Sequence, residues 1–501
     1  MPDSQQAHLS LWDSICLIIG IIIGASIYQA APEIFRNVDG PGMGMLAWGL
    51  GGAVSLIGAL CYAELASAYR TAGGDYTYLT RAYGPRVGFF FAWAELSVIR
   101  TGGSIAFMAY VFANYADQFH SLGQHSKLTY AVLGILSLTV INSLGMKPGR
   151  WVQNSLTVAN MVGLTGIILI GLYFFCFPRE GLNPEIQASV QIVSAIGSAA
   201  PPASAATVGA TSGGLLPETV FPSFALAMVL VFYAYGGWNE AAFIASEVKN
   251  PRQNVRRALI WGTLIVSLLY MLVNLAYLAA LGYWGVCNSK AIAGDMFALP
   301  FGEGGRKVIS ALVMISALGS VNGLLFTGMR LYGTFGSDHR VFSWLAGKGD
   351  KPHVAYGALF AQAGFSLLLI GVVELAAEWR QLLAAIAPYF NIELSADFHQ
   401  KGGIYRLVTC TAPVFWLFFF LTGCSVFILR YKDPLKERPY RVPLYPFIPL
   451  LFCASCLFML YRSASYAIDE EPAEAIVVIG LLILGVPLML MSGRSRATEQ
   501  E

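Results

Sequence analysis

An apolar run near the start of the chain is interrupted by small residues. The run Leu17–Tyr28 reads LIIGIIIGASIY, and Gly24, Ala25 and Ser26 follow one another inside it. A helix that only spans lipid gains no stability from small residues at its midpoint, because Gly is about 1 kcal/mol less favourable than Ala in a helix. A broken helix exposes backbone N–H and C=O groups. Within the hydrocarbon region of a membrane, such groups occur only where protein buries them or where they line a water-filled cavity. The run therefore predicts a binding site within a membrane protein.

A second interruption lies in the other half of the chain. Val231–Ala242 reads VFYAYGGWNEAA, and Gly236 and Gly237 break its apolar pattern. Two broken spans in separate halves of a chain are typical of the central site of a transporter. The alternative for the first break is a GxxxG motif, Gly20 and Gly24, that only lets two helices pack closely.

The composition of the chain is that of an integral membrane protein. Of its residues 56% are hydrophobic and 12% charged, against about 25% charged in a soluble domain. A span needs about 20 apolar residues. We therefore predict an all-α integral membrane protein with twelve transmembrane helices, at 13–33, 43–66, 86–113, 128–145, 152–177, 221–246, 258–281, 308–334, 354–373, 406–430, 444–466 and 474–492.

The charges in the loops predict the topology. Loops on the N-terminal side carry eighteen Lys and Arg residues, and the opposite loops carry eight. Because cytoplasmic loops are enriched in these residues, we expect a multi-pass protein of the cell membrane with both termini in the cytoplasm. The broken first and sixth spans then run in opposite directions, as in a five-plus-five inverted repeat. We expect one transporter domain over 1–501, with repeats at 13–177 and 221–430 and two further spans at 444–492.

Three segments lie outside these spans. Residues 188–214, rich in Ala, Ser, Gly and Thr, are expected to be a flexible loop, and 375–405 a short surface helix followed by a polar turn. We assign no function to either of these two segments. Tyr69–Gly84 is too polar to span, and we expect it to lie at the interface with its tyrosines at headgroup level.

The ends of the broken helices predict the ligand. N–H groups of Ala25, Ser26 and Ile27 would stabilise a carboxylate, and the carbonyls of Tyr233 and Ala234 would suit an ammonium group. An α-amino acid satisfies both. Residues 16–32 and 225–239 contain no Asp, Glu, Lys or Arg. We therefore expect a neutral substrate in a pocket without charged side chains.

Five longer stretches carry a family resemblance: Gly20–Tyr28, Tyr62–Gly84, Trp93–Leu96 with Ile99 and Arg100, Phe232–Val255 and Gly319–Leu331. Together they resemble the amino acid–polyamine–organocation (APC) superfamily, and most closely its L-type amino acid transporter (LAT) branch. The resemblance implies a LeuT-type inverted-repeat fold that works by alternating access.

The resemblance also implies roles at single positions. The first break would hold the substrate carboxylate, main-chain groups at Ile22, Tyr233 and Gly236 would receive the amine, and the Tyr233 ring would gate the site. The expected substrate-binding set is Ile22, Gly24, Ala25, Ser26, Ile27, Tyr233, Ala234, Tyr235, Gly236 and Asn239.

Two departures from the family pattern concern coupling and partners. Asn160 stands at the coupling position, where sodium-independent members have a lysine that replaces a cation. Exchange, a sodium ion and a proton bound elsewhere all stay open. The loop 116–128 has no cysteine, so no disulfide-linked heavy chain is expected.

Buried charges provide further candidates. Glu95 and Arg100 are five residues apart, about 140° around an α-helix, so we expect each to pair with a neighbouring helix rather than with the other. Arg330 is expected to pair with Glu64 or Glu247 and to close an inner gate; the alternative is a charge that reaches water at the membrane surface.

Other classes of function lack their residues. The net charge of +2 implies no nucleic-acid partner, and no HExxH, GxSxG or phosphate-binding glycine loop supports an enzyme. Cys453 and Cys456 lie in an apolar helix without other ligand types, so neither metal nor cofactor is expected. We predict a secondary active transporter that exchanges neutral α-amino acids across the bilayer. A proton- or sodium-coupled symporter and a non-transporting amino acid sensor are the alternatives.

Overall fold

The computed structural model describes residues 9–69, 71–177, 224–347, 354–374, 403–470 and 472–492. The predicted loop 188–214, and 375–405 as far as residue 402, lie outside the described residues.

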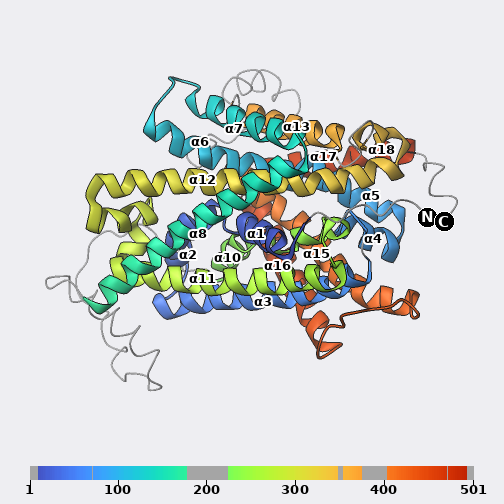
Figure 1. The fold of residues 1–501 in the computed structure, drawn as a ribbon, viewed down its shortest axis with the longest axis horizontal. Helices are drawn as coiled ribbons and strands as arrows, with labels where there is room; N and C mark the ends of the chain where they lie inside the picture. The colour runs from blue at the N-terminus through green and yellow to red at the C-terminus, as the bar shows by residue number, and fades with distance from the viewer. Residues whose placement is uncertain are drawn as a thin grey trace.

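Each of the twelve predicted spans contains helix among its described residues, and the predicted all-α fold is confirmed. The helices run mostly side by side, with α3, α11 and α12 along the length of the molecule (Figure 1). Seven helices among the described residues are long and apolar enough to cross a membrane by length and composition, and three shorter ones are also apolar. In chain order the helices are α1 (Leu11–Ile22), η1 (Ala25–Tyr28), α2 (Ala30–Arg36), α3 (Pro41–Ala68), α4 (Asp75–Tyr83), α5 (Pro85–Ala94), η2 (Glu95–Ala106), α6 (Phe107–Phe119), α7 (Ser126–Ser143), α8 (Met146–Cys176), α10 (Phe224–Ala234), η3 (Trp238–Ala242), η4 (Ala245–Glu247), α11 (Pro251–Asn288), α12 (Ile292–Asp338), η5 (Arg340–Leu345), α13 (Tyr356–Glu374), α15 (Gly403–Lys432), α16 (Phe447–Glu470), α17 (Pro472–Ile483) and α18 (Gly485–Met491).

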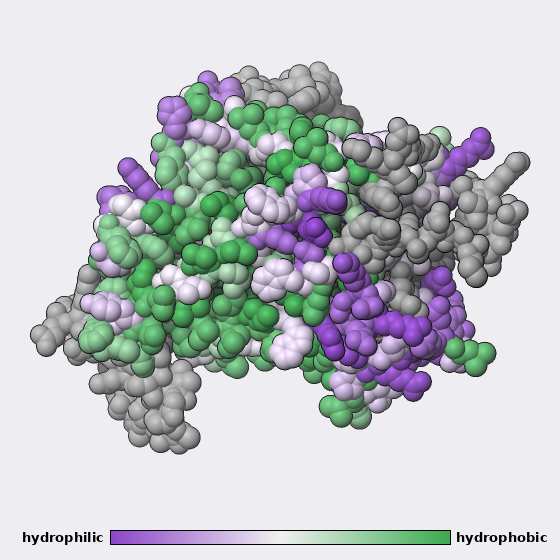
Figure 2. Space-filling view, in the orientation of Figure 1, coloured by the Kyte–Doolittle hydropathy of each residue, from purple (hydrophilic) through white to green (hydrophobic). Residues whose placement is uncertain are grey.

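The surface separates into an apolar and a polar region. Hydrophobic side chains cover most of the visible face, and hydrophilic ones gather at its lower right, where the connector between α15 and α16 lies (Figures 1 and 2). The exposed residue Lys432 ends α15, and the exposed residues Lys436 and Arg441 lie in the connector. An apolar face with a basic end is what is expected of a protein embedded in lipid.

Both predicted breaks are present. The first span ends its α-helix at Ile22 and continues as η1 and α2, and the sixth ends α10 at Ala234 and continues as η3 and η4. Gly237 begins η3 with φ +104°, a conformation that other residues rarely adopt, and a Cβ there would lie 2.6 Å from Cγ2 of Ile21. A glycine is therefore needed where the two broken spans meet.

The small residues of the first span also serve packing. A Cβ on Gly20 would lie 2.3 Å from the hydroxyl oxygen of Thr157 in α8. Gly20 thus lets α1 approach α8, as the alternative reading of the motif expects. Close packing and a break occur together in one segment.

The α4 helix differs from its prediction. Tyr76 and Tyr78 are buried in protein rather than placed at headgroup level. The Tyr76 hydroxyl donates to Asp338 at the end of α12, at 2.7 Å. The alternation of tyrosine and polar residues does not distinguish packing against protein from packing against lipid headgroups. A tyrosine has an aromatic body and a polar tip, and it suits both surroundings.

Candidate functional site

Side chains from three other helices satisfy the carbonyl groups freed by the first break. The Tyr270 hydroxyl of α11 lies 2.7 Å from the carbonyl oxygen of Ile22 and 3.1 Å from that of Ala234, and so bridges both breaks. The carbonyl of Ile23 accepts from the Asn160 amide at 3.0 Å and from Ser316 at 2.8 Å. An unsatisfied buried carbonyl costs about 1–3 kcal/mol, so these bonds make the broken backbone tolerable at membrane depth.

The breaks border a cavity of about 140 Å³. Of the predicted substrate residues, five line it: Ile22, Ser26, Tyr233, Gly236 and Asn239.

Gly24, Ile27, Ala234 and Tyr235 are not among the residues that line the cavity. A Cβ on Gly24 would lie 2.9 Å from Met108 and from Ser320, so Gly24 lets the backbone pass close to both side chains. The Tyr235 hydroxyl points to α3 and donates to the carbonyl of Trp48 at 3.1 Å. Ala25 and Ile27 belong to η1, and Ala234 ends α10.

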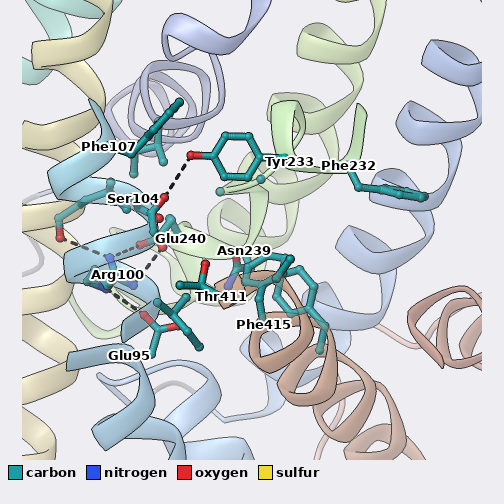
Figure 3. A pocket seen from close by; sticks show the side chains of 18 of the residues that line it. Glu95, Arg100, Ser104, Phe107, Phe232, Tyr233, Asn239, Glu240, Thr411 and Phe415 are labelled. Carbon is teal, nitrogen blue, oxygen red and sulfur yellow. Dashed lines mark hydrogen bonds and ion pairs between the residues drawn. The ribbon is translucent and has the colours of Figure 1, made fainter. Parts of the chain in front are cut away.

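Aromatic side chains close one side of the cavity. The ring of Tyr233 packs edge-on against Phe107, with centroids 5.6 Å apart, and its hydroxyl donates to the carbonyl of Gly103 at 3.0 Å (Figure 3). Phe232 packs similarly on Trp416 of α15. Tyr233 therefore joins the sixth span to the third across the cavity, the position from which a side chain could act as a gate.

The opposite side of the cavity is charged. The Arg100 guanidinium binds both carboxylate oxygens of Glu240, at 3.0 and 3.1 Å, and its Nε lies 3.1 Å from Glu95 (Figure 3). Thr327 of α12 donates to Glu240 and accepts from Arg100. Arg100 is buried, and it holds three spans together at the edge of the cavity.

The expectation that Glu95 and Arg100 would be poor mutual partners is wrong. Residues 95–106 form a π-helix, in which the backbone hydrogen bond runs from residue i to residue i+5. The wider turn places Glu95 and Arg100 on the same face. The second expectation, a bond to a neighbouring helix, holds for Arg100 and Glu240.

The expectation of an uncharged pocket is also wrong. Asp75, Glu95, Arg100 and Glu240 all line the cavity. Glu95 and Arg100 come from the third span and Asp75 from the α4 loop helix, while Glu240 directly follows Asn239. Residues 16–32 and 225–239 of the first and sixth spans contribute no charge, but the pocket takes its walls from other elements as well.

Asp75 connects the loop helix to the predicted site. Its Oδ2 accepts from the amide of Asn239 at 3.1 Å. The hydroxyls of Tyr62 and Thr422 lie beside the same carboxyl group. Burial raises the pKa of Asp75 to about 6, while the Asn239 amide and the nearby hydroxyls stabilise the ionised form and act in the opposite direction.

The candidate inner-gate residues separate into two ion pairs. Arg330 binds both carboxylate oxygens of Glu247 at 3.0 Å. Glu64 pairs instead with Arg430 of α15, at 2.6 and 2.7 Å. Next to Glu247, the backbone of Leu9 pairs with that of Glu247 and Lys249, so the segment before α1 is tied to the end of the sixth span.

Comparisons with known proteins identify the family. The family model described as amino acid permease matches residues 9–483, nearly the whole chain. The chain belongs to the amino acid permease family. It is therefore a transporter and not an enzyme, and the resemblance to the APC superfamily is confirmed.

Relatives of this permease span its full length. It is 28% identical over 488 residues to the b(0,+)-type amino acid transporter 1 of Mus musculus, covering 96% of this chain and 86% of that protein. It is 25% identical over 485 residues to the serine/threonine exchanger SteT of Bacillus subtilis (strain 168), covering 96% and 95%.

A solved structure shows the fold of the permease. Mhp1, a nucleobase-cation-symport-1 family transporter solved in a closed conformation with bromovinylhydantoin bound, aligns with a TM-score of 0.51 at 12% identity. The alignment covers 98% of this chain and 95% of that one. The permease accordingly has the LeuT-type fold with broken first and sixth spans.

Proposed function

We propose that this permease exchanges neutral α-amino acids across the cell membrane by alternating access. The observation that carries the proposal is the meeting of both breaks at one cavity, with Ile22, Ser26, Tyr233 and Gly236 on its wall. Main-chain N–H groups of η1 receive the carboxylate and carbonyls near Tyr233 receive the amine. The b(0,+)-type and serine/threonine relatives, which are an amino acid transporter and an exchanger by name, support the same substrate class.

The wider organisation follows from this proposal. Residues 13–177 and 221–430 form the two inverted repeats, and 444–492 lie outside them. Both termini face the cytoplasm, as the excess of Lys and Arg in the loops on their side indicates. The permease works without a disulfide-linked heavy chain, since the loop between α6 and α7 carries no cysteine.

Asn160 bears on how transport is coupled. Its amide donates to the carbonyl of Ile23 at 3.0 Å, and Tyr28 donates to its side-chain oxygen at 3.4 Å. The Asn160 side chain thus binds the backbone at the first break, and it neither titrates nor carries a positive charge that would repel a cation. A coupling proton would therefore need a group elsewhere in the protein, and the transport assay below separates exchange from symport.

Reconstitution into proteoliposomes tests the function. Labelled amino acid should enter only vesicles that hold unlabelled amino acid inside. Substrates are first found by thermal shift against the twenty amino acids, since a ligand at 100 times its Kd stabilises by about 2.7 kcal/mol. Entry into empty vesicles that follows a sodium or proton gradient would instead show a symporter, and binding without entry would show a sensor.

We further propose that the pair of Arg330 and Glu247 closes the inner gate. Glu247→Arg should lower exchange at least tenfold. Arg330 is buried and Glu247 partly buried, and truncating one partner of a hydrogen-bonded charge pair that is buried costs about 2–5 kcal/mol. Adding Arg330→Glu should restore most of the rate. Counterflow of labelled substrate in proteoliposomes is the measurement.

A matched control uses the other candidate acid. Glu64 binds Arg430, so Arg330→Glu should not rescue Glu64→Arg. Equal exchange in wild type and Glu247→Arg would show that this ion pair has no gating role.

A further inference from the structure

The charges around the cavity do not balance. Three carboxylates, those of Asp75, Glu95 and Glu240, line it together with one guanidinium, that of Arg100. Arg100 is already engaged by Glu240 through two hydrogen bonds and by Glu95 through one. Among the described residues no cation forms an ion pair with Asp75. Uncompensated carboxylates in a buried site favour the uptake of a proton.

Asp75 is the carboxylate whose surroundings suit reversible protonation. It is only 1% exposed, and burial raises its pKa to about 6. The polar and charged groups that face it come from every element around it: Tyr62 of α3, Tyr78 of α4, Glu95 of η2, Asn239 and Glu240 of η3, and Thr422 of α15. The carboxylates repel its charge, while the amide and the hydroxyls stabilise it. Opposed influences of this kind allow both protonation states near neutral pH.

Asp75 is also joined to the substrate site. Asn239 lines the cavity and donates its amide hydrogen to Asp75. This bond is charge-assisted while Asp75 is ionised, and a neutral carboxyl group accepts a bond about half as strong. Asn239 and Glu240 are neighbours on η3, so protonation of Asp75 acts on the same short helix that Arg100 holds.

We propose that Asp75 is a proton-binding site linked through Asn239 to amino acid binding in the cavity, so that a proton is taken up or released as substrate exchanges. The inference rests on the proposed function. It places the titrating group in the loop helix α4, since the coupling position holds the uncharged Asn160. Linkage is reciprocal: whatever amino acid binding does to the proton affinity of Asp75, protonation does to amino acid affinity.

The test compares pH profiles of exchange in proteoliposomes with the same pH on both sides. Wild type should change its rate with a midpoint near pH 6. Asp75→Asn, which resembles the protonated state, should be flat from pH 5 to pH 8, with the rate that wild type has at pH 5. A flat wild-type profile, or an unchanged profile in Asp75→Asn, overturns the inference and leaves the proposed function intact. Absence of exchange in wild type at every pH overturns the proposed function.

Two further measurements separate the proton site from a merely structural role. In weakly buffered detergent solution, adding substrate near pH 6 should change the signal of a pH-sensitive dye with wild type and not with Asp75→Asn. Asp338→Asn in α12 neutralises the carboxylate that accepts from Tyr76, which lies next to Asp75 in α4. This variant keeps Asp75, so its midpoint should stay near pH 6.

A second variant covers the case in which Asp75→Asn does not fold. Asn239→Leu removes a bond that favours the ionised carboxylate, so the midpoint of the proton signal should move to higher pH. A midpoint that stays in place in Asn239→Leu overturns the proposed link.

Discussion

Replacing Arg100 with Gln should abolish exchange and cost about 3–5 kcal/mol of folding stability. Arg100 is the shared cation of Glu95 and Glu240, and all three side chains are buried. Without it, two carboxylates remain in a low-dielectric site with no counter-charge. Size-exclusion profile and thermal unfolding in detergent measure the stability, and counterflow measures the exchange.

An exposed ion pair provides the control. Arg252 binds both carboxylate oxygens of Glu437 at 2.8 and 3.1 Å, the same paired geometry as Arg100 and Glu240. Its side chain is 47% exposed and that of Glu437 64%. Solvent screens such a pair, so Arg252→Gln should cost at most about 1 kcal/mol. Equal losses in the two variants would contradict the argument, which attributes the larger loss to the burial of Arg100 and to its second carboxylate, Glu95.

Replacing Tyr270 with Phe should weaken amino acid binding about tenfold. The hydroxyl is shared by the carbonyls of Ile22 and Ala234, one from each broken span, and it fixes the two ends that receive the ligand. Its loss leaves buried carbonyls with one partner fewer, at a cost of about 1–3 kcal/mol, or roughly 5- to 150-fold in an equilibrium constant. Titration of the thermal shift with the best amino acid gives the change in Kd.

Tyr277 is the matched control on the same helix. It is as buried as Tyr270, and among the described residues its hydroxyl has no hydrogen-bond partner. Tyr277→Phe should therefore leave the Kd within about twofold, since no bond is lost. A similar loss in both variants would show that the effect comes from packing of α11 and not from the bridge between the breaks.

Sequence reasoning located the breaks because their cause is local. Gly24 and Gly237 interrupt long apolar runs, and the backbone preference of glycine acts within a few residues of its position. The same reasoning failed for Glu95 and Arg100. The number of residues between two side chains says whether they share a face only if the type of helix is known. Residues 95–106 form a π-helix, whose wider turn places residues five apart on the same face.

The α4 helix shows another limit. Its pattern of tyrosine and polar residues predicts a place at the membrane interface, but the structure buries the helix in protein, with Asp75 against Asn239. Residues 75 and 239 are far apart in the chain. No local pattern indicates that a loop helix forms part of the wall around a cavity that the spans enclose.

The sequence by itself determined the class of molecule, its twelve spans and the two places where spans break, because hydrophobic length and glycine placement act along the chain. Only the tertiary structure decided the charge of the site. It brought Asp75, Glu95, Arg100 and Glu240 together around the breaks, and it chose Glu247 over Glu64 as the partner of Arg330. Electrostatic pairing depends on distances through space, which packing of the helices sets and residue order does not.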